Sequence, residues 1–541
     1  MMCQAKKILF GLFVWSAVGL TACSSGATPG GNNQTPEQYE SGSDVSETSE
    51  EDNQDMVKNY DELFQGLKLS PNYKSLFEQN PIMTQRFGAD PYAMVYGDRV
   101  YFYMTQDAFM YDAEGNVKEN DYSNCRTISV VSTDDMINFT DHGQIQIAGP
   151  NGAAKWAKNS WAPAAAWKNI DGKDKFFLYF ADGGGGIGVV TSDSPTGPFV
   201  DELGKGLIRR DMPNCGNVLW LFDPAVLVDD DGRAYIYFGG GVPQGRISDP
   251  GTGRVAELGD DMMSLKGEPV ALDVPYLFED SGIHKVNDTY YYTYCSNWQV
   301  DEAGTAKYGF KNAEIVSLES KSPMGPFTFK ETILSNPGQL CGEYGNNHHA
   351  VFSFKGNWYI TYHSRLMEKN MGVLHNYRCT HVVQFQMGED GTIGRIPHKQ
   401  EGREQLKYIN PYEKVNATCV SAMAGANTVP ADAETEKIGS GTFALKVVNT
   451  GDYVKIEGVD FGETAPKTIS ASVRGGSGDG VIQVKTGRLT GDVIGYLPIT
   501  EGKADFTTFT AELTGEVTGV TDLFFVFYGE GYEIADWSFE K

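Results

Sequence analysis

One pattern recurs five times in the middle of the chain and constrains its fold more than any other feature. Each copy begins with a Gly or Asp turn, continues as a short strand rich in aromatic residues, and ends in small or polar residues. The five copies occupy residues 96–107, 171–183, 229–241, 285–297 and 354–365. Gly, Asp and Asn at tight turns between such strands are typical of β-hairpins. Because one unit of this size cannot bury its own faces, we expect the five units to stack around one core.

This spacing predicts a five-bladed β-propeller over residues 67–408. After Asn410 the pattern changes, because residues 411–541 lose the aromatic units and carry short strands rich in Thr, Val and Gly. Short strands at regular turn spacing are typical of a β-sandwich. We therefore expect an all-β chain in which a five-bladed propeller precedes a sandwich domain.

The composition limits the partners of this chain. Acidic residues outnumber basic ones by 71 to 44, which gives a formal net charge of −27. Such a surface repels phosphate backbones and anionic headgroups, so we expect no nucleic-acid partner, whereas a neutral polysaccharide is compatible. Six cysteines follow residue 23 without CxxC or Cys/His metal spacing, so the sequence predicts mostly free thiols and neither zinc nor redox motifs.

The first 23 residues have the pattern of an export signal. Two lysines precede an apolar run at residues 8–20, which is too short to span a bilayer comfortably but fits a signal-peptide core. The run ends in Leu-Thr-Ala-Cys and resembles a bacterial lipoprotein signal, in which Cys23 is lipidated and becomes the mature N-terminus. An ordinary secretion signal with an incidental Cys23 is the alternative.

Residues 24–66 are rich in Ser, Gly, Asn, Asp and Glu and have no apolar period. This composition predicts a disordered acidic linker. Together with the lipoprotein signal, it implies an exported protein at the bacterial cell surface that touches the membrane only through its N-terminal lipid.

Three acidic residues stand apart from the solvated majority. Asp90, Asp223 and Glu279 lie among apolar or aromatic residues, just before the first, third and fourth units. A carboxylate in such surroundings is costly unless it has a function, and a turn-forming role is the alternative for any one of them. Three inward carboxylates at equivalent positions suit glycosidic hydrolysis, with one general base, one general acid and one residue that tunes the acid.

The motifs around these acids resemble glycoside hydrolase family 43, and the resemblance is strongest to its arabinoxylan arabinofuranohydrolase and β-xylosidase branches. In chain order they are GADPY (88–92), NSWAP (159–163), FDPA (222–225), FEDSGIHK (278–285) and GNNHHAVF (345–352). The resemblance implies a five-bladed propeller that hydrolyses with inversion. It implies that Asp90 is the general base, Glu279 the general acid, and Asp223 the residue that tunes the pKa of the acid.

The same resemblance implies further site residues. Trp161 would stack on a sugar face, Asn347 would contact substrate, and Arg378 would donate to sugar hydroxyls. His348 would lie near a metal ion, usually calcium, in the propeller's central channel and act on it through coordinated water. A core role for Trp161 and a structural role for the adjacent histidines are the alternatives.

Residues 411–541 resemble a family 6 carbohydrate-binding module, which is a jelly-roll sandwich. Two departures stand out. The acidic pair expected near residues 414–418 is replaced, although Asp536 is kept, and residues 503–506 lack the usual sugar-stacking Trp. We therefore expect the fold, with stability or positioning as its contribution.

These resemblances lead to one functional hypothesis and two alternatives. We expect an inverting exo-glycosidase that removes α-L-arabinofuranosyl side chains from arabinoxylan or arabino-xylo-oligosaccharides, with no organic cofactor. A β-1,4-xylosidase or a dual xylosidase/arabinofuranosidase is the alternative among enzymes. The alternative without catalysis is a surface glycan-binding lipoprotein.

Overall fold

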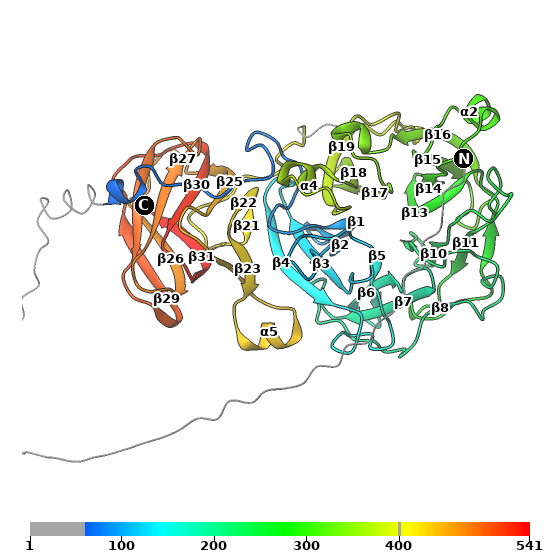
Figure 1. Ribbon diagram of the computed structural model, residues 1–541, viewed down its shortest axis with the longest axis horizontal. Helices are drawn as coiled ribbons and strands as arrows, with labels where there is room; N and C mark the ends of the chain where they lie inside the picture. Colours follow the sequence, from blue (N-terminus) through cyan, green and yellow to red (C-terminus); the bar gives the residue numbers. More distant parts are fainter. Residues whose placement is uncertain (1–59, 399–401) are drawn as a thin grey trace, which may run out of the picture. The chain divides into compact units, whose positions relative to one another are not determined.

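The computed structural model describes residues 60–398 and 402–541 and is almost entirely antiparallel β-sheet (Figure 1). Within these residues the chain between 89 and 385 forms five sheets in sequence order, and a β-sandwich follows. The predicted signal, Cys23 and residues 24–59 of the predicted linker lie outside the described residues. No helix among the described residues is long and apolar enough to span a membrane.

The five sheets of the described chain each pair sequential strands. The first contains β1 (Ala89–Tyr96), β2 (Arg99–Thr105), β3 (Thr127–Thr133) and β4 (Phe139–Gln146), extended by β21 (Cys419–Val420). The second contains β5 (Trp161–Ile170), β6 (Lys173–Ala181), β7 (Gly186–Ser192) and β8 (Ile208–Arg209). The third contains β9 (Ala225–Val228), β10 (Ala234–Phe238), β11 (Gly253–Glu257) and β12 (Val270–Leu272).

The fourth sheet contains β13 (Leu277–Val286), β14 (Thr289–Ser296), β15 (Ile315–Ser320) and β16 (Thr328–Leu334). The fifth contains β17 (His349–Phe354), β18 (Asn357–Ser364) and β19 (Cys379–Phe385). Short helices α2 (Glu302–Tyr308), α3 (Gly338–Cys341) and α4 (Leu366–Met371) lie in the connections.

The recurring aromatic pattern forms the hairpin between the first and second strands of each sheet. In the third sheet, for example, the Asp229–Gly232 turn closes the β9–β10 hairpin, with the Gly232 N–H donating to the Asp229 carbonyl. Gly232 has a φ of 80°, which a residue without a Cβ adopts readily. The second strands are buried over most of their length, because neighbouring sheets cover both faces, as in the aromatic run of β14.

The first strand of each sheet lies beside the first strand of the next. Strand β1 contacts β5, β5 contacts β9, β9 contacts β13, β13 contacts β17, and β17 returns to β1. This closed series brings the beginnings of strands that are far apart in sequence to a common centre. Side chains at those positions are therefore able to converge on one site.

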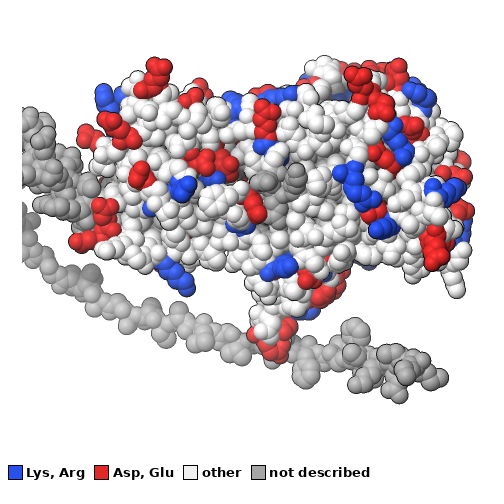
Figure 2. All heavy atoms as spheres, turned by 90° about the horizontal axis from the view of Figure 1, so that it is seen from above, with Lys and Arg blue, Asp and Glu red and all other residues white. Residues whose placement is uncertain are grey.

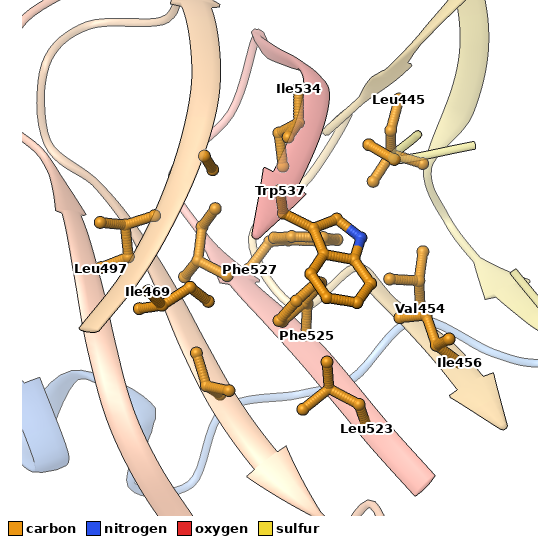
Figure 3. Packing of buried hydrophobic residues seen from close by; sticks show 14 of the residues in the cluster. Leu445, Val454, Ile456, Ile469, Leu497, Leu523, Phe525, Phe527, Ile534 and Trp537 are labelled. Carbon is orange, nitrogen blue, oxygen red and sulfur yellow. The ribbon is translucent and has the colours of Figure 1, made fainter. Parts of the chain in front are cut away.

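The sandwich packs two sheets against a common hydrophobic core. One sheet contains β20 (Val415–Asn416), β23 (Asn427–Pro430), β24 (Phe443–Lys446), β26 (Thr468–Gly475), β29 (Lys503–Glu512) and β31 (Tyr532–Glu540). The other contains β22 (Ala422–Ala424), β25 (Tyr453–Asp460), β27 (Gly480–Thr486), β28 (Val493–Ile499) and β30 (Val520–Tyr528). Helix α5 (Ala433–Ile438) joins β23 to β24. Figure 3 shows Trp537 among Phe525, Phe527 and Val454 at the centre of this core.

The structure differs from the prediction at the end of the linker. Residues 60–64 are helical, and Phe64 packs with Leu67 against the buried cluster that contains Tyr453 and Val526. The few apolar residues at this end are enough to order it, because a buried partner surface is present. Cys125, Cys215, Cys295, Cys341, Cys379 and Cys419 are all free, which confirms the prediction of free thiols for the described residues.

The surface carries both signs of charge despite the acidic total. On the face shown in Figure 2, Lys and Arg side chains lie interspersed with Asp and Glu and do not gather into one basic patch.

Trp537 offers a test of the sandwich core. Because its indole is 2% exposed within the core cluster, Trp537→Ala should leave a cavity and lower the free energy of unfolding by about 3–5 kcal/mol. Denaturant unfolding followed by far-ultraviolet circular dichroism measures this change. Val520→Ala, at a half-exposed position of β30, is the control and should change stability little. Equal stabilities of the two variants would contradict this account of the core.

Candidate active site

A cavity of about 420 Å³ lies where the strand beginnings converge. Its lining comes from all five sheets and their connections. The lining residues are Asp90, Tyr122, Trp161, Gly184, Trp220, Phe222, Asp223, Glu279, Asn346, His348 and Arg378. Six of the seven residues singled out from the sequence of the N-terminal sheets and their connections are among them, so the structure brings together side chains that are up to 288 positions apart.

Local backbone geometry aims the acidic side chains into this cavity. Asp90, Asp223 and Asp280 have φ values of 47°, 50° and 67°, in the left-handed region that non-Gly residues rarely adopt. In β1 and β13 the strand register shifts next to these residues, as expected of a β-bulge. Bulges at strand beginnings re-aim side chains, and backbone strain of this kind concentrates at functional sites.

This geometry changes one detail of the sequence interpretation. The residue of the fourth sheet that shares the left-handed conformation of Asp90 and Asp223 is Asp280, and Glu279 precedes it. The three predicted acids therefore do not occupy strictly equivalent backbone positions. Glu279 nonetheless lines the same cavity because its neighbour makes the bulge.

Arg378 is fixed by two carboxylates. Its Nε and Nη2 donate to the two carboxylate oxygens of Asp107, each at 2.8 Å, and its Nη1 donates to Asp90 Oδ1 at 2.7 Å. The guanidinium also lies over the ring of Tyr122, with its Cζ 4.6 Å from the centroid. A bidentate pair of this kind is geometrically specific, so Arg378 presents one fixed edge to Asp90.

The surroundings of Asp90 favour its charged form. Burial alone would raise the pKa of Asp90, but the Arg378 guanidinium, together with the nearby His363 and His348 side chains, outweighs burial and holds the pKa well below its usual range. The backbone N–H of Asp90 donates to His363 Nδ1 at 3.0 Å, and His363 Nε2 lies 3.0 Å from the carbonyl oxygen of Asn346. Since a carbonyl only accepts and an amide only donates, His363 carries its proton on Nε2. One tautomer of His363 thus links Asp90 to the cavity wall at Asn346.

Asp223 and Glu279 experience the opposite environment. Burial raises the pKa of both, and a neighbouring carboxylate raises each further, Asp90 for Asp223 and Asp223 for Glu279. The backbone N–H of Asp280 donates to Asp223 Oδ2 at 3.0 Å, which favours the anion at Asp223. Glu279 Oε1 is buried without a hydrogen-bond partner among the described residues. The donor at Asp223 therefore favours Glu279 as the protonated member of the pair.

His348 lies between the acids. Its Nε2 is 3.1 Å from Asp280 Oδ1, and its Nδ1 is 3.5 Å from Asp90 Oδ1 and 3.9 Å from Asp223 Oδ2. Both oxygens of Asp280 also face the N–H groups of His349. Among the described residues no group of three or more His, Cys, Asp or Glu side chains is arranged to hold a metal ion. The donor set does not fit direct coordination of calcium by His348, and calcium held through water stays a prediction.

Asn347 does not line the cavity. Its side chain is fully buried, and Nδ2 donates to the carbonyl oxygen of Ala313 at 3.0 Å. The adjacent Asn346 lines the cavity in its place. Adjacent residues of an extended segment point to opposite sides, so a one-residue offset moves the side chain out of the site.

Aromatic side chains form much of the remaining wall. Trp161 lines the cavity and donates from Nε1 to the Tyr122 carbonyl oxygen at 2.9 Å. Trp220 packs edge-on against Phe222 and Phe278, with ring centroids 5.3 and 5.4 Å apart. The sequence interpretation missed Tyr122, Trp220, Asp107 and His363. Trp220 lies three residues before Asp223, which is the signal that could have identified it, whereas local sequence does not mark Tyr122, Asp107 or His363.

The arrangement is suited to acid–base chemistry on a neutral substrate. One buried carboxylate stays ionised beside a guanidinium, while a second carboxyl keeps its proton on the same cavity wall. Aromatic faces and a few fixed polar groups surround the space between them. Pairs of titratable groups with opposed pKa shifts mark the acid and the base of an enzyme site.

Comparison with known proteins agrees with this chemistry. Glycosyl hydrolases family 43 matches residues 78–393, and the carbohydrate binding module of family 6 matches residues 417–541. An arabinoxylan arabinofuranohydrolase from Paenibacillus polymyxa is 45% identical over 466 residues, covering 84% of this chain and 72% of the relative. A second, from Bacillus subtilis, is 41% identical over 473 residues, covering 85% of this chain and 91% of the relative.

A solved structure supports the same relationship. The crystal structure of a glycoside hydrolase family 43 arabinoxylan arabinofuranohydrolase from Bacillus subtilis, in complex with cellotetraose, aligns with a TM-score of 0.81 at 38% identity. The alignment covers 87% of this chain and 99% of that chain. The chain therefore belongs to glycosyl hydrolases family 43 and carries a C-terminal family 6 carbohydrate binding module.

Proposed function

We propose that this enzyme is an inverting exo-glycosidase that removes α-L-arabinofuranosyl side chains from arabinoxylan. The observation that carries the proposal is the pair Asp90 and Glu279, which line one cavity with opposed pKa shifts. Inverting hydrolysis needs an ionised base and a protonated acid at the same pH. The choice of arabinoxylan rests on the relatives from Paenibacillus polymyxa and Bacillus subtilis, which are arabinoxylan arabinofuranohydrolases.

The architecture we propose for residues 67–408 is a five-bladed β-propeller. The closed series of contacts from β1 through β5, β9, β13 and β17 supports it. In a propeller the first strands line the central axis, which is where the cavity residues converge. The jelly-roll connectivity of the C-terminal sandwich belongs to the same proposal.

In this mechanism Asp90 accepts a proton from the attacking water, and Glu279 donates its proton to the glycosidic oxygen as the bond breaks. The water attacks the face of the sugar opposite the leaving group, so the anomeric configuration inverts. The negative charge of Asp223 beside Glu279 raises the pKa of the acid, which keeps its proton available. Each residue thus acts in the protonation state that its surroundings favour.

Arg378 and the aromatic wall would hold the sugar. Arg378 uses three of its five N–H donors on Asp107 and Asp90 among the described residues. Its two other N–H bonds are able to serve sugar hydroxyls, because the guanidinium lines the cavity. Trp161 offers an aromatic face for stacking beside them.

The enzymatic alternative is β-1,4-xylosidase activity, alone or together with arabinofuranosidase activity. A xylosidase/arabinosidase from Humicola insolens, 31% identical over 359 residues and covering 58% of this chain and 98% of the relative, keeps this alternative open. A glycan-binding protein without catalysis is disfavoured, because the acid–base pair is complete.

Side-by-side assays separate these functions. We expect hydrolysis of nitrophenyl α-L-arabinofuranoside and release of arabinose from arabinoxylan, with hydrolysis of nitrophenyl β-D-xylopyranoside at least tenfold slower. Chromatography of the released sugars measures both activities. Faster release of xylose than arabinose from the polymer would refute the proposed specificity, and release of neither sugar would refute the proposed activity.

The acid–base assignment predicts two different losses. Glu279→Ala should impair substrates with poor leaving groups most, because an activated aryl leaving group needs little protonation. Asp90→Ala should impair every substrate, by about 10²–10⁴-fold, because none can dispense with the activated water. The rates on a series of aryl arabinofuranosides and a natural oligosaccharide measure the difference.

Glu319→Ala is the matched control, since Glu319 lies on β15 and pairs with Lys330 outside the cavity. It should change neither rate. A Glu279→Ala enzyme that is impaired equally on good and poor leaving groups would overturn the assignment of the acid.

We also propose that the protein is an exported lipoprotein tethered through Cys23, on the basis of the Leu-Thr-Ala-Cys sequence that ends the signal. Stable anchoring needs more than one acyl chain, and lipoprotein modification supplies them. The wild type should partition into the detergent phase of a Triton X-114 extract and the Cys23→Ala variant should not. Detergent partition of the variant would refute the proposal.

The C-terminal domain would contribute stability or positioning more than glycan affinity. Asp536, the one acid kept where a calcium site is expected, lies 3.6 Å from Lys414 Nζ. Phe506, in the stretch where a stacking Trp is expected, lies near the beginning of β29, and Arg474 Cζ lies 4.5 Å from its ring centroid. A lysine and an arginine thus occupy the two places where a bound cation and a sugar would be expected.

A further inference from the structure

Asp280 is a buried acid for which the proposed mechanism has no use. It directly follows Glu279 in β13 and is fully buried. Its φ of 67° places it in the left-handed region. A glycine meets that backbone requirement without strain and without a charge. The backbone conformation therefore does not explain why a carboxylate is present beside two other acids.

The hydrogen bonds of Asp280 show what the residue holds. Its Oδ1 faces the backbone nitrogen of His349 at 3.2 Å and His348 Nε2 at 3.1 Å. Its Oδ2 faces His349 Nδ1 at 2.5 Å. Both oxygens therefore face nitrogen donors, and neither faces a hydrogen-bond acceptor. The carboxylate connects β13 to the histidine pair at the beginning of β17.

The backbone of Asp280 makes a second connection. Its N–H donates to Asp223 Oδ2 at 3.0 Å, so the peptide that joins Glu279 to Asp280 is tied to Asp223. One residue thus contacts both the acid that would tune Glu279 and the histidine that lines the cavity. His349 Nε2 lies 2.8 Å from Thr293 Oγ1 of β14, which anchors the other end of the network.

We propose that Asp280 is a positioning residue for the general acid Glu279. Through its backbone it holds the Glu279 peptide against Asp223, and through its carboxylate it fixes the orientation of His348 and His349. Its carboxylate also places a negative charge beside Glu279, and Asp280 itself does not line the cavity. This inference rests on the proposed function, because it assigns Glu279 as the acid.

The charges around Glu279 give the direction of the expected effect. Burial raises the pKa of Glu279, the carboxylates of Asp223, Asp280 and Asp90 raise it further, and Arg378 lowers it. Tyr122 and the Cys295 thiol also face this group, each as a neutral side chain with a raised pKa. Removing the charge of Asp280 lowers the pKa of Glu279, so the acid loses its proton at a lower pH. Activity that needs the protonated acid should then decline at a lower pH.

Two variants test this proposal. Asp280→Asn and Asp280→Gly both remove the charge, and both residue types tolerate a left-handed backbone. We expect the alkaline limb of the kcat/KM profile to move down by about one pH unit in each, the scale on which a neighbouring charge shifts a carboxyl group. We expect kcat to fall more on poor leaving groups than on activated aryl glycosides, with KM changed less than kcat.

Asp229→Asn is the matched control. Asp229 is another buried acid, but it lies in the β9–β10 turn, where it contacts Lys285 and Tyr290. Its substitution should leave the alkaline limb in place. Thermal unfolding of each variant identifies those that fold. If Asp280→Asn does not fold, the test is made with Asp280→Gly, which relieves the backbone strain.

Three results would overturn the role of Asp280. They are an alkaline limb at the wild-type pH in a folded Asp280 variant, an equal shift in Asp229→Asn, and a rate loss independent of the leaving group. The profiles are measured on whichever aryl glycoside, arabinofuranoside or xylopyranoside, the wild type hydrolyses. An error in the proposed sugar specificity is thereby distinguished from an error in the role of Asp280.

Discussion

The ion pair between Arg378 and Asp90 is the interaction on which the rest of the site depends. Five carboxyl groups are buried near one another, and a cluster of this kind would take up protons unless a cation offsets part of the charge. Asp107 accepts hydrogen bonds from Nε and Nη2 of the guanidinium, and Nη1 donates to Asp90. This ion pair favours the ionised form of Asp90. Glu279 accepts no hydrogen bond from Arg378 among the described contacts, and its surroundings favour the protonated form.

The fold supplies these groups from segments that no short peptide could bring together. Four of the five first strands, β1, β5, β9 and β13, have a left-handed residue at or just before the end that reaches the centre, where the backbone departs from regular strand geometry. The strain at Asp90 and Asp223 is held by the hydrogen-bonded sheets outside them, whose second strands are deeply buried. The rigid periphery therefore maintains a centre whose conformation is locally unfavourable.

The sequence predicted an all-β chain with a C-terminal sandwich and singled out three acids that the structure places in one cavity, because both features leave local signals. Aromatic strands bounded by Gly or Asp turns predicted the sheets, and acids in apolar surroundings predicted Asp90, Asp223 and Glu279. Asp107 and His363 act through partners 271 and 273 positions away, so their role depends on tertiary contacts that local sequence does not encode. Asn346 lines the cavity where Asn347 was predicted to, because the motif alone does not show which of two adjacent asparagines faces the cavity.

The central claim is that Asp90 and Glu279 hold opposite protonation states at one pH. Carbon-13 NMR of enzyme labelled at the Asp and Glu side-chain carboxyl carbons, with Asp90→Asn and Glu279→Gln used for assignment, measures both states directly. The account predicts that Glu279 titrates well above the usual Glu range of about 4.3, while Asp90 stays ionised to the lowest pH at which the fold persists. A Glu279 resonance that titrates in the usual range, or an Asp90 resonance that takes up its proton first, would contradict it.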